Sequence, residues 1–389
     1  MGVNRSKRIV VGGSVAQRAG QGGHTWLFVQ YVLGLKRLGW DVLLLDRLEP
    51  DMCRDAAGAP CAFEQSANLA YWQTVIDRFG LRGCASLSYN GGEHVIGVPR
   101  RQALDHVRSS ACVLNVMGFI DDAAVLEAAA LNVFVDIDPG FTQMWQDLGQ
   151  TDFLDGHDAF VTVGANLGRP DCAIPTCGRD WIPWRQPVLL DCWGGSTPDR
   201  PARFSSVGAW RGPYDPVAHG GRTYGLRAHE FRRFVSLPGA VDQQFEVALD
   251  IDAHDERDRA LLHSHGWTLA DPAVVAKDPW AYREYVWRSD AEFMVAKGMY
   301  AQTNSGWFSD RSICYLAAGR PVLAQATGIG HLYPTGEGLV TFSTLDEACA
   351  GAEDIMGDYQ RHASAAREIA AEYFDSDRVF RDLLCRLGV

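Results

Sequence analysis

Several charged and polar side chains stand where predicted strands end, and these residues could bind a phosphate. Residues 304–322, NSGWFSDRSICYLAAGRPV, read as a polar, glycine-containing loop that runs into a short helix and then a buried strand. Ser309 can cap the helix, Gly319 suits the left-handed position after it, and Pro321 prevents its continuation. The free amides and the positive dipole end of such a helix suit a phosphate, although an ordinary strand–loop–helix joint has the same pattern.

This segment and two nearby loops hold the candidate binding residues for an anionic ligand. The segment contributes Ser305, Gly306, Trp307, Ser309, Asp310, Arg311 and Ser312. A cation such as Arg311 at a helix start opposes the helix dipole, which a bound anion would explain. Arg211 and Lys297 are the other cationic candidates, because each follows a predicted strand at the edge where open α/β sheets bind ligands. A solvated surface charge is the alternative for both.

Aromatic and acid–base candidates complete the set. Trp210 and Trp307 could stack on a base, a sugar or an acceptor, or could belong to the core. Near the start of the chain, Gly22 and Gly23 are further candidates for binding the anionic ligand, and they precede His24. A neutral imidazole at this position could deprotonate an acceptor hydroxyl, and a histidine that only caps the helix is the alternative.

The triplet Asp136-Ile137-Asp138 ends a predicted strand and invites a metal assignment. Both carboxylates face the same side of a strand that is about to end, which is common at the carboxyl edge of a sheet. We therefore expect Asp138 to line a cleft and to orient His24, and we expect no metal site.

Two successive β/α series must position these residues. Residues 8–11 (RIVV), a glycine-rich loop, a helix over 26–38 and a strand over 41–45 (DVLLL) form a β-α-β unit, which predicts a parallel sheet. The loop lacks GxGxxG and is about twice too long for a dinucleotide turn, so we reject NAD. A second series follows the GGSTP run at residues 194–198. The predicted domains are 1–195, 196–365 and a terminal helix over 366–389.

Composition limits the classes of function. The chain has 389 residues, enough for two domains, and its net charge of −12 argues against general binding to nucleic acids or anionic membranes. Its 10 cysteines form no CxxC motif, so a zinc site is not expected and a reducing compartment fits best. No signal peptide and no apolar run of about 20 residues is visible. We therefore expect a cytoplasmic protein without a membrane span.

Three stretches resemble the GT-B glycosyltransferases. The glycine loop GGHTW at residues 22–26, followed by KRLGWDV, is similar to the glycine loop of that family and its continuation. The run YLAAGRPV at residues 315–322 is similar to the family's EAxAxGxPV motif. The segments GEGL and LDEA, which begin at Gly336 and Leu345, are similar to its xGxxGLxxxxxDxEAL segment.

The resemblance implies an α/β protein with two Rossmann-like domains that face each other across a cleft, the first on the acceptor side and the second binding the nucleotide-sugar. It further implies a C-terminal helix that crosses back to the first domain. It also implies metal-independent transfer of a sugar from a nucleotide-diphosphate sugar, such as a UDP-sugar, to a hydroxyl, without any other cofactor. The proline- and tryptophan-rich residues 174–193 indicate a small apolar or aromatic acceptor. Sugar, acceptor and oligomeric state stay open.

One departure from the family weakens the transfer of site residues. Members with the EX7E signature carry glutamates where this chain has Gly306 and Cys314, so the usual ribose- and hexose-binding carboxylates are absent. Asp310 is the nearest acid, and retention or inversion at the anomeric carbon stays undecided. A nucleotide-sugar 2-epimerase of the same fold and a binding protein without turnover are the alternative functions.

Overall fold

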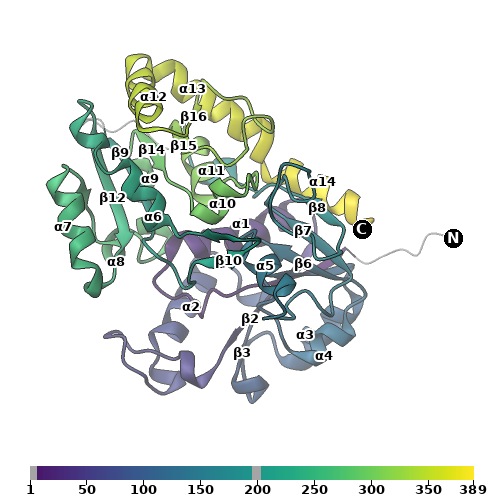
Figure 1. Cartoon of the computed structure of the whole chain (residues 1–389). Coiled ribbons are helices and arrows are strands. Elements are labelled where there is room, and N and C mark those ends of the chain that lie inside the picture. The colour runs from purple at the N-terminus through teal and green to yellow at the C-terminus, as the bar shows by residue number, and fades with distance from the viewer. Residues whose placement is uncertain (1–6, 195–202) are drawn as a thin grey trace.

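The computed structural model describes residues 7–194 and 203–389, and two separate sheets dominate it (Figure 1). The first sheet has the strand order β4-β3-β2-β1-β5-β6-β7-β8, and only the β3–β4 pair is antiparallel. Its strands are β1 (Arg8–Gly12), β2 (Asp41–Leu48), β3 (Ala85–Tyr89), β4 (His94–Gly97), β5 (Cys112–Val116), β6 (Asn132–Asp136), β7 (Ala159–Thr162) and β8 (Trp181–Pro183). The parallel sheet predicted from the first β-α-β unit is confirmed.

Each helix of this sheet lies in the connection between two successive strands, which is the usual layout of a mainly parallel sheet. They are α1 (Gly22–Arg37), α2 (Ala67–Arg78), α3 (Arg100–Ser109), α4 (Ala123–Ala128) and α5 (Phe141–Asp147). Helix α1 begins at Gly22, one turn before the predicted start at residue 26. Glycine has a poor helix propensity, so the first turn depends on the tertiary contacts described below.

The second sheet is entirely parallel, with the strand order β13-β12-β9-β14-β15-β16. Its strands are β9 (Arg203–Ala209), β12 (Gln244–Asp250), β13 (Thr268–Leu269), β14 (Ala291–Met294), β15 (Val322–Gln325) and β16 (Leu339–Phe342). A separate hairpin, β10 (Val217–His219) and β11 (Arg222–Tyr224), follows β9. The helices are α6 (Arg227–Phe231), α7 (Glu256–Ser264), α8 (Pro272–Val275), α9 (Pro279–Trp287), α10 (Gly298–Gln302), α11 (Asp310–Ala317), α12 (Leu345–Gly357), α13 (Tyr359–Ile369) and α14 (Ser376–Leu387).

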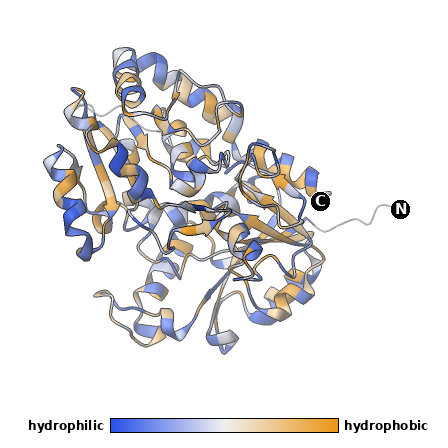
Figure 2. Ribbon diagram, viewed as in Figure 1, coloured by the Kyte–Doolittle hydropathy of each residue, from blue (hydrophilic) through white to orange (hydrophobic). Residues whose placement is uncertain are grey.

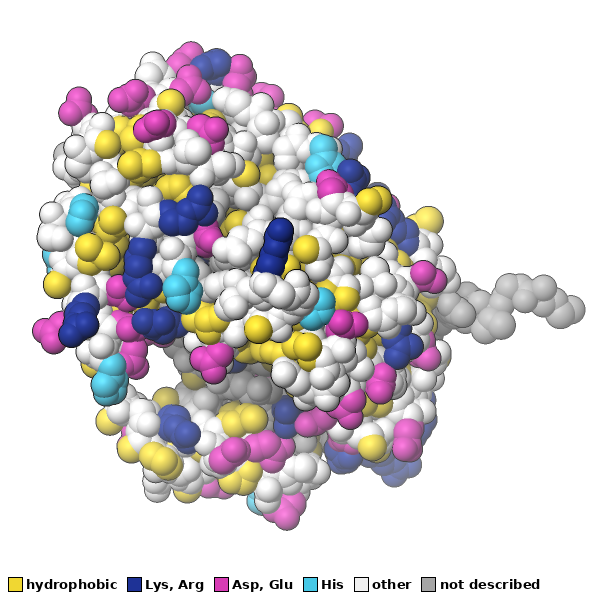
Figure 3. Space-filling view, in the orientation of Figure 1, with side chains coloured by type: hydrophobic (Ala, Val, Ile, Leu, Met, Phe, Trp, Pro, Cys, Tyr) yellow, Lys and Arg dark blue, Asp and Glu magenta, His cyan; other side chains and the backbone are white. Residues whose placement is uncertain are grey.

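The two sheets form two lobes. We call residues 7–194 the first lobe and residues 203–374 the second lobe. The predicted domain boundary at residues 195 and 196 lies outside the described residues. Figure 1 shows the second lobe above the first, and Figure 3 shows the surface hollowed between them at the left of the view.

The C-terminal segment crosses back to the first lobe, as predicted. Helix α13 is followed by a π-helical turn over Ala370–Phe374, and α14 starts after Asp375, whose carboxylate accepts a bond from the amide of Asp377. Helix α14 packs on α1, where a Cβ at Gly34 would lie 2.9 Å from the ring of Phe380. Glycine therefore permits this close helix contact.

The apolar side chains are concentrated in the sheets. Figure 2 shows apolar strands in both lobes, covered by helices whose outer faces are polar. This is the layered arrangement that buried parallel sheets require. Within the described ranges, no helix combines the length and the apolar character needed to cross a membrane.

Candidate active site

An ion pair joins the two lobes at the carboxyl edges of their sheets. Asp138 follows β6 of the first lobe, and Lys297 follows β14 of the second. The Lys297 Nζ lies 2.9 Å from each oxygen of the Asp138 carboxylate, and the two side chains are only 14% and 18% exposed. Burial lowers the pKa of Lys297, while Asp138 opposes this shift. The predicted cleft residues Asp138 and Lys297 therefore meet across the lobes.

The loop between β1 and α1 brings another positive charge, that of Arg18, close to the interface between the lobes. The Asp46 carboxylate, at the end of β2, accepts a 2.8 Å bond from the amide of Ala16, and Asn68 donates a 2.9 Å bond to the Ala16 carbonyl. Burial raises the pKa of Asp46 to about 7. These bonds hold the loop in the conformation that presents Arg18.

Arg18 is a cation without a counter-ion among the described residues. Its guanidinium has no hydrogen bond or ion pair with any residue that the structure describes. Its charge lowers the pKa of His24 and opposes the rise in the pKa of Tyr214, a second-lobe residue in the loop before the β10–β11 hairpin. Arg18 therefore lies near both lobes. Arg18 was not among the predicted site residues, although a cation in a glycine-rich loop is a visible signal in the sequence.

His24 lies beside Arg18 in the first turn of α1. Its Nε2 is 2.8 Å from Ser14 Oγ, and its ring meets Phe28 and Phe119 edge-on. Burial, together with the charge of Arg18, lowers the pKa of His24 to about 3. The ring is therefore neutral at physiological pH. The helix has Gln21 at its N-cap and no side-chain cap bond, so the capping alternative for His24 is wrong.

Arg227 is a second arginine for which the described part of the chain provides no carboxylate partner. It opens α6 in the second lobe and is buried, and its guanidinium donates to the carbonyls of Val295 (3.1 Å) and Ala209 (3.0 Å). No described carboxylate lies within ion-pair distance of it. Burial and the charge of Arg311 lower the pKa of Arg227 to about 9, while Glu292, Asp138 and Asp310 oppose this shift. No motif in the sequence singled out Arg227.

The predicted cap of α11 is confirmed, but the reason for Arg311 is not an anionic ligand. Ser309 Oγ accepts a 3.2 Å bond from the Arg311 amide, and Gly319 has the expected positive φ of 69°. The Arg311 side chain forms a buried ion pair with Glu292 of β14 and donates a 2.8 Å bond to the Val207 carbonyl. The Glu292 carboxylate therefore neutralises Arg311, and no bound anion is needed to explain an arginine at the start of this helix.

The segment before α11 lies in the interface between the lobes. The backbone N–H of Asn166, in the first lobe, donates a 3.0 Å bond to the Ser305 carbonyl. The Gly306 amide bonds to Thr327 O and the Trp307 amide bonds to Ser305 Oγ, so neither amide is available to a phosphate. Trp307 stacks on Tyr300 with ring centroids 4.2 Å apart and is a core aromatic in this structure.

Two polar groups of α11 remain near the cleft. Burial raises the pKa of Asp310, the first residue of the helix. Its charge also contributes to the pKa shifts of Arg227 and of Tyr31 in α1, so it lies between the lobes. Ser312 Oγ is buried and has no hydrogen-bond partner among the described residues.

The glycines before His24 allow α1 to approach the second lobe. The Gly22 amide donates a 2.7 Å bond to the Ala276 carbonyl, and a Cβ at Gly22 would lie 2.1 Å from the Asp278 carbonyl. A Cβ at Gly23 would lie 2.9 Å from the Tyr282 ring. Both positions therefore need glycine for close packing, and the Gly22 amide is already bonded.

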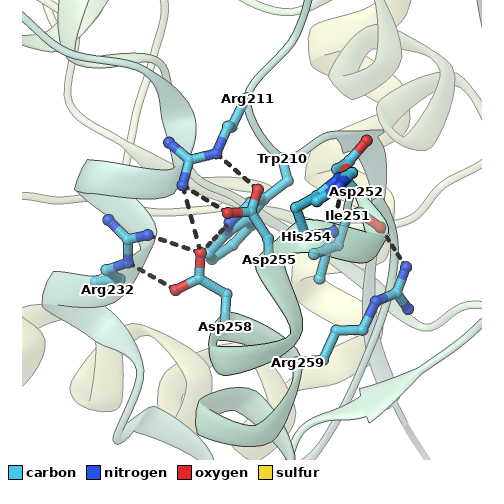
Figure 4. A network of polar contacts seen from close by, with 9 residues as sticks. All are labelled: Trp210, Arg211, Arg232, Ile251, Asp252, His254, Asp255, Asp258 and Arg259. Carbon is cyan, nitrogen blue, oxygen red and sulfur yellow. Dashed lines mark hydrogen bonds and ion pairs between the residues drawn. The ribbon is translucent and has the colours of Figure 1, made fainter.

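Trp210 and Arg211 belong to a polar network with α7 (Figure 4). Trp210 is buried in the second-lobe core, where its Nε1 donates a 2.7 Å bond to Asp258. Arg211 forms two bonds of 2.6 and 2.7 Å with the Asp255 carboxylate. The structure therefore places neither a free stacking ring nor an unpaired cation at these predicted positions.

The Asp136 carboxylate points to the interior, unlike that of Asp138. It accepts bonds from Thr162 Oγ1 (2.7 Å) and Gln143 Nε2 (2.8 Å). Burial raises the pKa of Asp136 to about 6. Across residues 7–194 and 203–389, no group of three or more acidic, histidine or cysteine side chains has the arrangement of a metal site.

The sequence matches no known protein-family profile, and it matches no curated protein. The structure is similar over nearly all of its length to solved glycosyltransferase structures. For HepE from Anabaena in complex with UDP-glucose, the TM-score is 0.59 at 12% identity, with 98% of this chain and 99% of that chain covered.

Two further structures show the same likeness. An alpha-glucosyltransferase in complex with UDP and DNA has a TM-score of 0.58 at 10% identity, and sucrose-phosphate synthase from Thermosynechococcus elongatus has 0.53 at 14% identity. Each alignment covers 98% of this chain and 99% of the other. At such identities the likeness establishes the fold, and the two Rossmann-like lobes have the GT-B arrangement.

Proposed function

We propose that this protein transfers a sugar from a nucleotide-diphosphate sugar to a hydroxyl group of an acceptor. One observation carries the proposal: Arg18 of the first lobe and Arg227 of the second have no carboxylate partner among the described residues. Arginine binds phosphate through two parallel hydrogen bonds, and a buried arginine without an anion is costly. A diphosphate between the lobes would compensate both charges.

The chemistry requires that negative charge on the leaving diphosphate is stabilised. Arg18 and Arg227 supply up to two positive charges for this purpose, and the loop and helix contacts described above preorganise them. Lys297 adds a third when its ion pair with Asp138 opens. Because these cations come from both lobes, they would hold the diphosphate in one position between the lobes. This would also align the donor with the acceptor.

The acceptor hydroxyl must lose its proton as its oxygen bonds to the anomeric carbon. The bond from that carbon to the diphosphate oxygen breaks at the same time, and its electron pair leaves with the diphosphate. We assign the proton to the Asp138 carboxylate, which lies between the lobes at the carboxyl edge of the first sheet and becomes available when its ion pair with Lys297 opens. His24 then holds the acceptor hydroxyl by a hydrogen bond.

Two of the similar structures contain UDP or UDP-glucose, so a uridine nucleotide is the first donor to test. We expect UDP to bind to the full chain in isothermal titration. Substitution Arg18→Ala should weaken UDP binding about 10- to 100-fold, because a charge-assisted hydrogen bond contributes roughly 1.5–3 kcal/mol. Arg227→Gln should have a similar effect.

The matched control is Arg222→Ala, which removes an exposed positive charge from strand β11. Its UDP affinity should stay within about twofold, since exposed charges contribute little. Equal UDP affinity in Arg18→Ala, Arg227→Gln and the wild type would refute the proposed diphosphate site. Release of UDP from a UDP-sugar upon addition of acceptor would then test transfer.

A further inference from the structure

The first lobe contains a cavity of about 340 Å³ that the sequence analysis did not anticipate. It opens at the carboxyl edge of the first sheet, between the ends of β2, β3 and β5 and helices α3 and α4. Its apolar lining consists of Leu45, Val95, Ala103, Leu104, Phe119, Ile120 and Val125. Pockets of this size and character hold small organic ligands.

Acidic side chains outnumber basic side chains around the cavity. Arg47 lies 3.1 Å from Asp121 and 3.6 Å from Glu49, and Arg100 forms a pair with Asp122 at 2.6 Å. Both guanidiniums therefore already have carboxylate partners. With Asp46, four carboxyl groups face two guanidiniums, and burial raises the pKa of Asp46 to about 7. Near neutral pH the lining thus keeps an excess of one to two negative charges.

The cavity shares a wall with the interlobe site. Phe119 lines the cavity, and its ring meets the His24 ring with centroids 6.3 Å apart. Asp46 also lines the cavity and accepts the Ala16 amide from the loop that presents Arg18. A molecule in the cavity would therefore lie next to the groups that we assign to the donor and to the proton transfer.

We propose that this cavity binds the acceptor, and that the acceptor is a small neutral or positively charged molecule with an apolar body. A phosphorylated or carboxylated acceptor would meet the acidic lining at a cost in affinity, because no described guanidinium of the lining is free to bind it. This inference rests on the proposed function for the role of the ligand, but the selectivity of the cavity can be tested separately.

Three phenols that differ in charge test the selectivity: tyramine, 4-ethylphenol and 4-hydroxyphenylacetate are positive, neutral and negative at pH 7. Their binding to the full chain is measured by ligand-observed NMR, with and without UDP. We expect tyramine and 4-ethylphenol to bind, and 4-hydroxyphenylacetate to bind at least about tenfold more weakly. Equal binding of the anion and the cation, or no binding of any of the three, would overturn the proposal.

Two variants locate the binding at the cavity. Ser88→Trp fills part of it from strand β3 and should reduce the affinity for tyramine and 4-ethylphenol at least about tenfold. Glu49→Lys changes the charge of the lining by two units. It should weaken the binding of tyramine and strengthen the binding of 4-hydroxyphenylacetate. Glu353→Lys, an equal charge change on the exposed face of α12, is the control and should alter neither affinity.

UDP titration of the same variants separates this proposal from the proposed function. Unchanged probe affinity in Ser88→Trp would overturn the cavity as the binding site, even if UDP binds normally. Failure of UDP to bind, with charge-selective probe binding that Ser88→Trp abolishes, would refute the donor site and leave the cavity as a ligand site.

Discussion

Four arginines near the two sheet edges differ in what surrounds them, and their neighbours decide what each can bind. Arg211 is held by Asp255, and Arg311 by the buried Glu292. Arg18 and Arg227 have no carboxylate within reach among the described residues. An ion-paired guanidinium gains little from a new anion, whereas an unpaired one gains a charge-assisted bond. The latter two are therefore the stronger ligands for a diphosphate.

At the same scale, His24 predicts a pH dependence of stability. Its pKa is about 3 in the folded protein and about 6.5 in an unfolded chain, so the unfolded state binds the additional proton. The contribution of His24 is therefore fully present above about pH 6.5 and is lost as the pH falls toward 3. The loss can reach about 1.4 kcal/mol per pH unit.

Denaturant unfolding of the wild type and of His24→Gln between pH 4 and pH 8 measures this effect. Glutamine can still bond to Ser14 but does not titrate. We expect the stability advantage of the wild type to shrink steadily below about pH 6.5. A difference that does not vary with pH would contradict the low pKa of His24.

At the scale of elements, α1 is the helix on which the two lobes meet. Its first turn contacts the residues before α9, and its middle contacts α14. Trp26 of α1 donates a 2.6 Å bond to the Pro279 carbonyl of the second lobe. The glycines at both contacts are therefore requirements of packing, and the resemblance of GGHTW to a phosphate-binding glycine loop did not reveal this role.

Substitution Gly22→Ala should destabilise this contact. The new Cβ would lie 2.1 Å from a backbone carbonyl, which cannot rotate away as a side chain can. We expect a loss of about 1–3 kcal/mol in the free energy of unfolding, measured with urea. Gly357→Ala, where a Cβ meets nothing within 4 Å, is the control and should be neutral or slightly stabilising. Equal stability of the two variants would show that the lobes separate without cost.

At the scale of the whole molecule, the Asp138–Lys297 pair is a charge contact that spans the lobes. Asp138→Asn leaves Lys297 mostly buried without its anion, and we expect a loss of about 3 kcal/mol in the free energy of unfolding. The same loss is expected for Lys297→Met, which leaves the Asp138 carboxylate without its cation. The double variant should be closer to the wild type than the sum of the two losses, because neither charge then remains.

A double-mutant cycle by urea denaturation measures the coupling. Additive losses would mean that the pair does not hold the lobes together. If UDP competes with Asp138 for Lys297, Asp138→Asn should also bind UDP more tightly than the wild type, although its transfer activity should fall sharply.

Local sequence was sufficient for much of the architecture. Alternation of apolar runs with helical periods predicted two parallel sheets, and Ser309 and Gly319 marked the ends of α11. These features depend on backbone conformation and on side chains within a few residues of each other, so a short window of sequence contains their causes.

Only the tertiary structure decided which charged residues are free. Glu292 lies 19 positions before Arg311, and Asp255 lies 44 positions after Arg211, and no local pattern announces either pair. The acidic cavity likewise combines the ends of three strands and two helices. Ion pairing and cavity shape arise from contacts between distant segments, so the sequence identified the carboxyl edges as the place of the site, and the fold selected the residues that can act there.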